Sequence, residues 1–481
     1  MTRVLLAAFC VLLGTSLRAG EPGPGVHAGR ERVPVRQGFP VDFSRSPFGG
    51  EIRGSVQAVD IDGDGKKEIL FGSFDGMIHL FHADGTEVRD GLWPRHTGGP
   101  IVGSVRAGDL DGDDTPEVLA ASYDGKLYAF SDRGDRLWTA DTHQPGLTST
   151  PVLAGKPGIY SRSVLMTTPD GNLHALNANG SRMWLHPGRT PAGAPPAEVD
   201  LEGKGERQIL LRDDSGIFSL IGKDGTVVRQ WPREGYNERD GPAPFYVADL
   251  YGDGNRQIVA LQKEALSPGA VPRTPGCPDK LPRQGEQGVF VWNASGEAAS
   301  VFPVDGVAGS SLRAGDVKGD GRRDLVFADQ TGRLHVTGPD GTPRKGWPLE
   351  IRDLYKQVDD HRLDPRGNPA VERTPVLADV DGDGAPDVIF CVNDPRQADE
   401  LGGMVFAVDA SGKLLAGFPK FVGRNHGELV VADLDDDGEM ELIVPAGIGA
   451  TGRQLHVFNL PSSQKLEMIL LGSDFQMFKG E

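Results

Sequence analysis

A short acidic segment that recurs along the chain constrains the fold more than any other feature of the sequence. Its first copy, DIDGDGKKE at 60–68, places acids at Asp60, Asp62, Asp64 and Glu68 around two glycines. Counterparts of Asp60 stand at Asp109, Asp200, Asp249, Asp316, Asp379 and Asp433, and Gly155 occupies this place in a copy without acids. These eight anchors lie 45 to 67 residues apart. A period in the forties, lengthened by insertions, is typical of one blade of a β-propeller.

Each repeat also contains four short runs in which apolar and polar residues alternate, separated by Gly, Asn or Asp turns. Alternation with a period of two residues predicts strands, and the short turns predict that the four strands are antiparallel. No segment has a convincing helical period. The sequence therefore predicts an all-β protein, a β-propeller of four-stranded antiparallel blades, with eight blades and seven as the alternative.

The first and last repeats indicate how the ring closes. The last repeat, after RQLHVFNL at 453–460, lacks a clear fourth strand, whereas QGFPVDFSRS at 37–46 resembles the fourth-strand runs and precedes the first acidic segment. We therefore expect an N-terminal strand to complete the final blade and to cover two sheet edges that would otherwise be open. The C-terminal segment 466–478 competes for the same role.

Acids at alternate positions of a tight turn indicate a calcium site. Calcium takes about six to eight oxygen ligands from carboxylates and carbonyls, and carboxylates brought together without a cation repel one another. Asp60, Asp62 and Asp64 hold positions one, three and five of the first copy, the Lys66 carbonyl holds position seven, and Glu68 holds position nine. An EF-hand is excluded, because position twelve, which must be acidic there, is apolar and lies in a strand-like run in each complete copy.

The motif Asp-x-Asp-Gly-Asp-Gly-x-x-Glu between two strands resembles the FG-GAP/VCBS repeat of integrin α-subunit propellers and of many exported bacterial proteins. The resemblance covers the chain from about Gly38 onward, eight times over. It implies calcium held in the loop between the first two strands of a blade, and a role in partner binding or adhesion. One departure is that the integrin propellers have fewer blades than the eight repeats counted in this chain.

Carrying this scheme over copy by copy gives four complete sites. Their expected ligands, with the residue at position seven acting through its carbonyl, are Asp60, Asp62, Asp64, Lys66 and Glu68; Asp109, Asp111, Asp113, Thr115 and Glu117; Asp379, Asp381, Asp383, Ala385 and Asp387; and Asp433, Asp435, Asp437, Glu439 and Glu441. The second loop has Asp114 where the others have glycine, which leaves its turn geometry open.

Other loops lack the full ligand set. The fourth and fifth repeats have Lys204 and Tyr251 at ligand positions, and we expect them to hold no metal. In the sixth repeat Lys318 stands at position three. We expect its ammonium to pair with the carboxylates of that loop and to take the place of calcium.

The N-terminus and the net charge predict where the protein acts. Residues 1–20 have a basic start at Arg3, an apolar run and a small-residue end near Ala19, which is the pattern of a secretory signal peptide. No later segment approaches the length of a membrane span. We expect a signal peptide at 1–20, a linker at 21–37 and a propeller at 38–481, in a monomer that is secreted, periplasmic or on the cell surface. The net charge of −18 disfavours nucleic acid as a partner.

Three function classes fit these observations. We favour a non-catalytic, calcium-stabilised propeller that binds a protein or a glycan, since neither a catalytic pair nor an organic cofactor site stands out. The first alternative is a polysaccharide lyase, because some lyases are propellers with similar loops, and the segment 351–373 with His361 could supply a base. The second is a quinone-cofactor dehydrogenase, because the segment DGKLYAFSDRGDRLW at 124–138 resembles the repeat of those propellers. This chain lacks the pair of adjacent cysteines that is common in such enzymes.

Four histidines recur at one position of the third strand. They are His79, His174, His335 and His456. Equivalent residues of different blades lie around a ring and do not converge, so we interpret these histidines as packing between blades.

Overall fold

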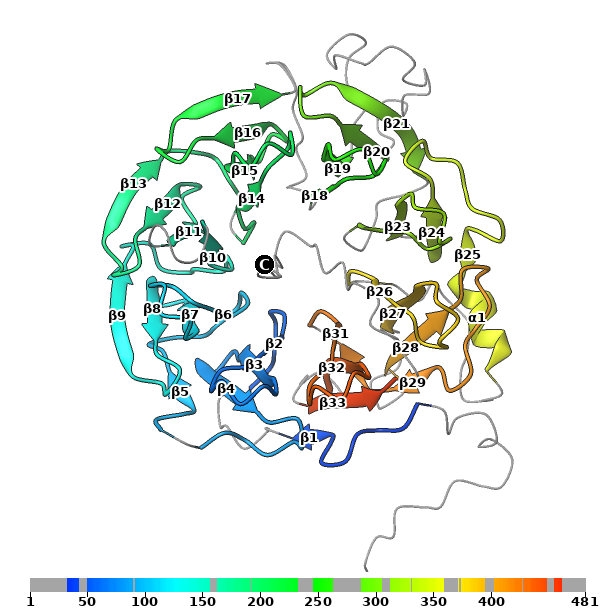
Figure 1. Cartoon of the computed structure of the whole chain (residues 1–481), viewed down its shortest axis with the longest axis horizontal. Coiled ribbons are helices and arrows are strands. Elements are labelled where there is room, and N and C mark those ends of the chain that lie inside the picture. Colours follow the sequence, from blue (N-terminus) through cyan, green and yellow to red (C-terminus); the bar gives the residue numbers. More distant parts are fainter. Residues whose placement is uncertain are drawn as a thin grey trace, which may run out of the picture.

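Eight antiparallel sheets stand around a ring, and each sheet is one blade of a propeller (Figure 1). The computed structural model describes residues 33–42, 50–89, 91–155, 162–191, 193–231, 245–262, 287–304, 312–329, 331–358, 371, 373–393, 402–425, 427–447 and 454–460. The first strand of each blade lies nearest the centre and the fourth lies at the rim. The all-β fold and the prediction of eight blades are thereby confirmed.

Seven blades use four consecutive strands each. Blade 1 contains β2 (Gln57–Val59), β3 (Glu68–Gly72), β4 (Met77–Phe81) and β5 (Arg95–His96); blade 2 contains β6 (Arg106–Gly108), β7 (Glu117–Ala121), β8 (Lys126–Phe130) and β9 (Arg136–Asp141). Blade 3 contains β10 (Val152–Ala154), β11 (Ser163–Thr167), β12 (Leu173–Leu176) and β13 (Arg182–His186); blade 4 contains β14 (Ala197–Val199), β15 (Gln208–Arg212), β16 (Phe218–Ile221) and β17 (Val227–Trp231). Blade 5 contains β18 (Phe245–Ala248), β19 (Gln257–Gln262), β20 (Gln287–Trp292) and β21 (Ala298–Val304). Blade 6 contains β22 (Arg313–Gly315), β23 (Asp324–Ala328), β24 (Arg333–Thr337) and β25 (Leu349–Glu350); blade 7 contains β26 (Val376–Ala378), β27 (Asp387–Asn393), β28 (Gly403–Val408) and β29 (Lys420–Phe421).

The eighth blade joins the two ends of the described chain. Its strands β31 (Val430–Ala432), β32 (Glu441–Gly447) and β33 (Gln454–Asn459) are completed by β1 (Val41–Asp42), and the short β30 (Arg424–Asn425) also pairs with β32. Val41 stands opposite Leu455, and Val35 forms a further bridge to Phe458. The prediction of an N-terminal closing strand is thereby confirmed. The competing segment 466–478 lies outside the described residues.

Apolar side chains fill the space between every pair of neighbouring blades, in eight clusters. The strands that supply them, such as β3 with the sequence EILFG, are buried along their whole length and therefore read as continuous apolar runs. Between blades 8 and 1, Val457 shares a cluster with Ile69 and Phe71. Because no pair of neighbours lacks such a cluster, blades 7, 8, 1 and 2 form one contiguous arc.

Tryptophans at the rim connect a blade to the next one. The indole Nε1 of Trp93 donates to the carbonyl of Asp132 (2.6 Å), and Nε1 of Trp138 donates to the carbonyl of Ala178 (2.8 Å). Each acceptor lies in the turn between the third and fourth strands of the following blade. A Cβ atom at Gly180, in that turn, would lie 2.6 Å from the Trp138 ring, so the turn requires a glycine. Trp184 with Lys223 and Trp347 with Ala410 repeat the bond.

A short helix corrects the expectation that no segment is helical. The helix α1 (Ile351–Gln357) follows β25, and its residues Ile351, Leu354 and Tyr355 are buried between blades 6 and 7. Their spacing is that of one helix face, but seven residues inside a charged segment are too short a window to reveal a period. In the part of the chain that the structure describes, no helix has the length and apolar character needed to cross a bilayer.

Candidate metal centres

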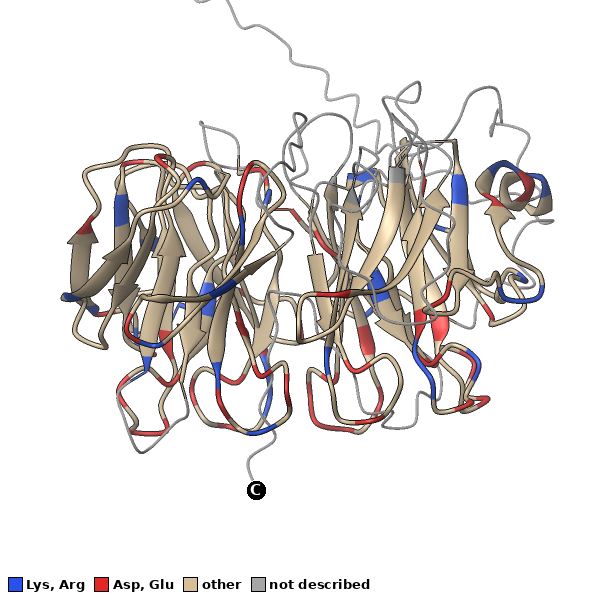
Figure 2. Ribbon diagram, turned by 90° about the horizontal axis from the view of Figure 1, so that it is seen from above, with Lys and Arg blue, Asp and Glu red and all other residues tan. Residues whose placement is uncertain are grey.

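The acidic segments form the loops between the first and second strands of the blades, and these loops gather on one face of the ring (Figure 2). In the first loop Asp60, at position one, accepts hydrogen bonds from the backbone N–H groups of Gly63 (2.7 Å) and Gly65 (3.0 Å). The φ angle of Gly65 is +91°, which a glycine adopts without strain. Asp114, which stands in the place of Gly65 in the second loop, has a φ of +66°. The turn that the sequence left open therefore has a left-handed residue at this position too.

The residue at position nine begins the second strand and turns its carboxylate back into the loop. Glu68 accepts a hydrogen bond from the N–H of Ile61, at position two (3.1 Å), and Asp387 accepts one from Val380 (2.7 Å). Glu117 and Glu441 make the same bond with Leu110 and Leu434. All four carboxylates are buried. Their positions are thus fixed by the strand and the loop backbone, independently of any ligand.

Four groups of three carboxylates lie close enough together to share a cation, and we call them triads. In each triad, oxygen atoms from positions one, three and nine lie within 4.8 Å of one another. The triads are Asp60, Asp62 and Glu68; Asp109, Asp111 and Glu117; Asp379, Asp381 and Asp387; and Asp433, Asp435 and Glu441. They belong to the four loops in which the sequence predicted complete sites.

The predicted ligands at position five lie outside the triads. Asp64 instead accepts a hydrogen bond from the N–H of Lys66, at position seven (2.8 Å). The same bond joins Asp113 to Thr115, Asp383 to Ala385 and Asp437 to Glu439. This bond holds the residue at position seven, whose carbonyl is the remaining predicted ligand, within the turn.

Burial and mutual repulsion make the triads costly without a cation. Burial, together with the charges of neighbouring acids, raises the pKa of Glu117 and of Asp387 to about 7. Burial also raises the pKa of Glu441 to about 7. Among the described side chains, Oδ1 of Asp433 is buried and accepts no hydrogen bond. A set of closely spaced oxygen donors of this kind fits a hard cation such as calcium, which would offset the repulsion.

Among the described residues, Arg36 and His82 contact carboxylates of the triads, and the loop motif did not reveal either. Arg36 forms an ion pair with Glu441 (Nη1 to Oε1, 2.7 Å) and also contacts Asp435. Nδ1 of His82 lies 3.2 Å from Oε1 of Glu68. Arg36 reaches its triad only because the N-terminal segment closes the ring, and His82 reaches its triad from the hairpin of its own blade. Neither position lies within the repeated acidic segment, so no spacing rule points to it.

Neighbouring loops are hydrogen-bonded to each other. The N–H of Lys67, at position eight of the first loop, donates to the carbonyl of Leu434, at position two of the eighth (2.7 Å). Nζ of Lys67 donates to the carbonyl of Asp433 (2.7 Å). The equivalent backbone bond joins Arg256 of the fifth loop to Leu201 of the fourth (3.1 Å). A change in one loop can therefore be transmitted to the next through the backbone.

The loops of blades 4 and 5 keep the turn but lack the carboxylate set. At position nine of the fifth loop, Gln257 accepts the N–H of Leu250 through its amide oxygen (2.8 Å), so an amide replaces the buried carboxylate. At position three, Tyr251 replaces the aspartate. In the fourth loop Lys204 forms an ion pair with Glu202 (2.6 Å). Among the described residues, neither loop forms a carboxylate triad.

In blade 6, two basic side chains pair with carboxylates of the acidic loop. Nζ of Lys318 lies 3.1 Å from Oδ2 of Asp320, which is the ion pair that the sequence predicted. The sequence did not predict the second basic side chain, Arg344, whose Nε donates to Oδ1 of Asp324 at position nine (2.5 Å). Arg344 occupies the place of an apolar residue, Val88 in blade 1, since the N–H of each bonds to the third strand of its blade. A charged residue at this otherwise apolar position of the repeat was the signal in the sequence that could have predicted the ion pair between Arg344 and Asp324.

Part of the chain is similar to a described family. Residues 74–184 match a protein-family model described as the lambda-carrageenase beta-propeller domain. The matched region runs from the turn before β4 to β13, within blades 1 to 3, and is less than half of the chain. A comparison with curated proteins found no match.

Several solved structures share the architecture. BamB from Moraxella catarrhalis has 14% sequence identity and a TM-score of 0.53, with 89% of this chain and 100% of that chain covered. Sqt1 from Saccharomyces cerevisiae has 11% identity and a TM-score of 0.56, with 89% and 100% covered. The exotype rhamnogalacturonan lyase YesX has 16% identity and a TM-score of 0.56, with 88% and 76% covered. At these identities the likeness shows the propeller fold.

Proposed function

We propose that this chain is an exported, calcium-binding β-propeller of the FG-GAP/VCBS type that acts as a non-catalytic binding module for a protein or a glycan. The observation that carries the proposal is the set of four carboxylate triads, each built at equivalent positions of equivalent loops. Asp60, Asp62 and Glu68 would hold calcium in blade 1, and the other triads would hold it in blades 2, 7 and 8. The cation would supply structural stability, and no chemical step is assigned to it.

The donor chemistry favours calcium over a transition metal. Every triad consists of carboxylates, and the loop offers further oxygens from its backbone. Zinc and copper favour histidine and cysteine ligands, whereas calcium takes carboxylate and carbonyl oxygens in flexible geometry. A rigid ring with many loops on one face is also a common arrangement for a binding surface.

A second candidate function is an enzyme that acts on a polysaccharide. It is favoured by the match of residues 74–184 to the propeller domain of a lambda-carrageenase family. Incubation with lambda-carrageenan, followed by a reducing-end assay, tests hydrolysis, and incubation with rhamnogalacturonan, followed at the absorbance of unsaturated products, tests a lyase. If either assay shows turnover above that of a heat-denatured sample, the proposal of an enzyme replaces that of a non-catalytic binding module.

Calorimetric titration of the metal-free protein with calcium tests the main proposal. We expect four calcium ions per chain, one for each triad. Asp111→Asn removes one carboxylate of the second triad and should leave three strong sites. Asp84→Asn is the matched control, since Asp84 is an exposed aspartate in a turn of blade 1 outside every triad, and should leave four. No binding by the parent protein, or the same four ions in the Asp111 variant, would contradict the assignment.

A further inference from the structure

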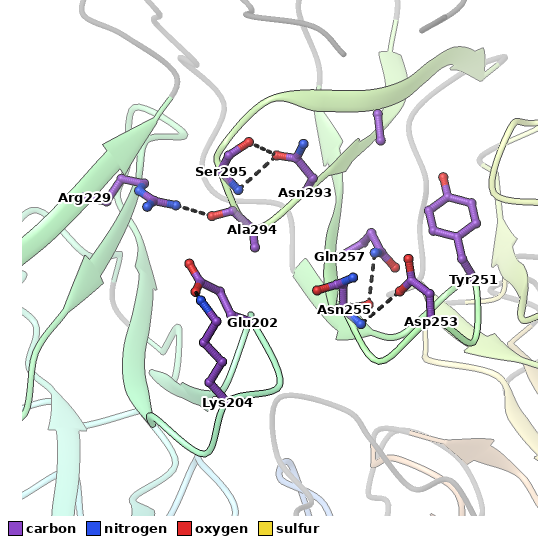
Figure 3. Close-up of a pocket in the computed structure, with 11 residues that line it drawn as sticks. Glu202, Lys204, Arg229, Tyr251, Asp253, Asn255, Gln257, Asn293, Ala294 and Ser295 are labelled. Atoms are coloured by element: carbon purple, nitrogen blue, oxygen red, sulfur yellow. Dashed lines mark hydrogen bonds and ion pairs between the residues drawn. The ribbon is translucent and has the colours of Figure 1, made fainter. Parts of the chain in front are cut away.

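A polar cleft of about 590 Å³ lies between the loops of blades 4 and 5, on the face that carries the triads (Figure 3). Glu202, Lys204, Tyr251 and Asp253 come from the acidic loops of the two blades, and Asn293 comes from the turn before β21. Its size lies within the usual range of small-molecule sites, about 300–1,000 Å³. The cleft therefore has room for a ligand of a few sugar rings.

This cleft is lined by three residues that replace metal ligands, Lys204, Tyr251 and Gln257, and by two acids that the loops retain. Glu202 and Tyr251 stand at position three of their loops, Lys204 and Asp253 stand at position five, and Gln257 stands at position nine. The turn itself is retained, because Asp249 still accepts the N–H of Gly254 at position six (2.8 Å). Two neighbouring loops have thus kept their backbone and exchanged a cation site for a lined cavity.

The charges in the cleft are balanced within the protein. Nζ of Lys204 pairs with Oε2 of Glu202 (2.6 Å), and Arg229 donates to the carbonyl of Ala294. Of the four charged side chains in the lining, Glu202 and Asp253 are acidic, and Lys204 and Arg229 are basic. The described residues of the lining therefore have no net charge, and the chain as a whole has a net charge of −18. Because the described acidic and basic side chains are equal in number and the whole chain is negatively charged, the cleft favours a neutral ligand over an anionic one.

An exposed aromatic ring, an exposed amide and an exposed hydroxyl group line the cleft. The Tyr251 side chain is 43% exposed and stands at the edge of the cleft (Figure 3). Asn255 and Ser295 are also exposed there. Amides and hydroxyls both donate and accept hydrogen bonds, and a tyrosine ring presents an apolar face beside a polar hydroxyl. A pyranose ring has the complementary surface, with an apolar C–H face and a rim of hydroxyl groups.

We propose that this cleft binds a neutral oligosaccharide, with one pyranose ring stacked on Tyr251 and a hydroxyl group bonded to the side-chain amide of Asn255. The inference rests on the proposed binding function and gives that function a ligand class and a place on the ring. Gln257 is buried and acts indirectly, because its Nε2 donates to the carbonyl of Asn255 (3.0 Å) and so positions that residue. A peptide partner fits less well, since the described lining contains few apolar residues, namely Tyr251, Ala294 and Ala299.

Calorimetric titration of the whole chain in calcium, with cellotetraose and β-1,4-galactotetraose as neutral probes, tests the inference. We expect at least one of the two to bind. Tyr251→Ala should weaken that binding about tenfold, as expected for the loss of an aromatic anchor, and Tyr251→Phe should change it less than about twofold. The matched control is Tyr123→Ala, since Tyr123 is 51% exposed but lies in the turn between β7 and β8, on the opposite face of the ring. That variant should bind as the parent does.

The outcomes separate this inference from the proposed function. If neither neutral probe binds, if a lambda-carrageenan tetrasaccharide binds more tightly than both, or if Tyr123→Ala weakens binding as much as Tyr251→Ala, the cleft is not the site that we propose. A calcium titration of the same samples reports on the triads alone. If four calcium ions bind but no saccharide does, only the assignment of the cleft is overturned. If a saccharide binds but the calcium titration shows no bound ion, the assignment of the cleft is supported and that of the calcium sites is overturned.

Discussion

The arc of blades 7, 8, 1 and 2 and the arc of blades 3 to 6 share a backbone design but differ in what their loops hold. Both arcs contain loops in which the aspartate at position one accepts the N–H of position six, as in Asp60 with Gly65 (3.0 Å) and Asp316 with Gly321 (2.7 Å), although blade 3 has Gly155 at position one. The arcs differ at positions three and nine, where only the first arc has carboxylates throughout. The turn therefore depends on position one, whereas positions three and nine decide between a cation site and another use.

The second arc replaces the carboxylate triad in three different ways. Blade 3 has no acids in its loop, and the N–H of Gly155 donates instead to Glu198 of the next blade (2.9 Å). Blades 4 and 5 form the polar cleft, and blade 6 supplies Lys318 and Arg344 as internal cations. Each solution satisfies the loop without metal, so the stability of this arc should not depend on calcium.

Chelation should have the largest effect, and it should be confined to the first arc. At free calcium ten times the dissociation constant, each independent site stabilises by about 1.4 kcal/mol, so four sites contribute about 5–6 kcal/mol. Excess EGTA should therefore lower the melting temperature by many degrees. Hydrogen exchange should accelerate first in blades 7, 8, 1 and 2, because those blades contain the triads.

Two results would contradict this difference between the arcs. An unchanged melting curve in EGTA would show that the triads hold no stabilising cation. Equal acceleration of exchange in all eight blades would show that the ring responds as one unit, and the contrast between the arcs would then have no energetic meaning.

Acid should weaken the first arc through His456. Burial lowers the pKa of His456, in β33, to about 4 from its usual 6.5, and its Nε2 is buried without a hydrogen bond. The unfolded chain therefore binds a proton near pH 6.5 that the folded chain does not bind until about pH 4. The stability contributed by the neutral ring is full above pH 6.5 and is lost as the pH falls towards 4, a loss of about 3 kcal/mol. Chemical unfolding at pH 7 and pH 4 measures it.

The variant His456→Phe isolates this contribution, because a ring without a titrating nitrogen stays neutral. Its free energy of unfolding should fall by about 3 kcal/mol less than that of the parent over the same pH range. The comparison in the second arc is His335→Phe. His335 has an acidic partner, with Nε2 2.8 Å from Oδ2 of Asp329, so this variant shows the effect of the same substitution where the ring is hydrogen-bonded. Identical pH profiles of the free energy of unfolding for the parent and His456→Phe would show that His456 does not make the first arc sensitive to acid.

Blade 6 offers a way to extend the first arc by one blade. Lys318→Asp restores a carboxylate at position three, but Arg344 would still pair with Asp324 at position nine. We therefore expect Lys318→Asp together with Arg344→Gln to bind one calcium ion more than the parent, and at ten times its dissociation constant this ion should add about 1.4 kcal/mol. Arg344→Gln alone should bind no additional ion. A double variant with unchanged stoichiometry in calorimetry would show that positions three and nine do not define the site.

The eighth triad should be the weakest of the four, because Arg36 already pairs with two of its residues. Arg36→Gln removes a positive charge beside the cation and should tighten calcium binding at that site about fivefold, or about 1 kcal/mol. The first triad contacts His82 instead of an arginine, so its affinity should not change. Competition with a calcium-sensitive dye measures the four affinities, and a weaker eighth site in the variant would show that Arg36 supports the cation.

The sequence predicted the features that are written into local spacing. Alternating runs and turn glycines predicted the four-stranded blades. The missing fourth strand of the last repeat predicted that an N-terminal strand, which contains Val41, closes the ring. The triads followed from positions one, three and nine of a single segment. Arg36, Arg344 and the cleft were not predicted, because each depends on residues from different blades or hairpins that only the closed ring brings together. The helix α1 was missed because its seven residues are fewer than a periodic pattern needs.

The pairing of β1 with β33 has a consequence for the order in which the protein is made. Synthesis delivers Val41 early, yet its partner Leu455 emerges more than four hundred residues later. At about 5–20 residues per second, the first strand waits roughly 20–80 s before its partner exists. During that interval β1 has no strand to pair with, and the apolar face of blade 1 towards blade 8 has no cover. The ring can thus be completed only after translation has passed the last blade, and a chaperone that holds the early segment would act in that interval.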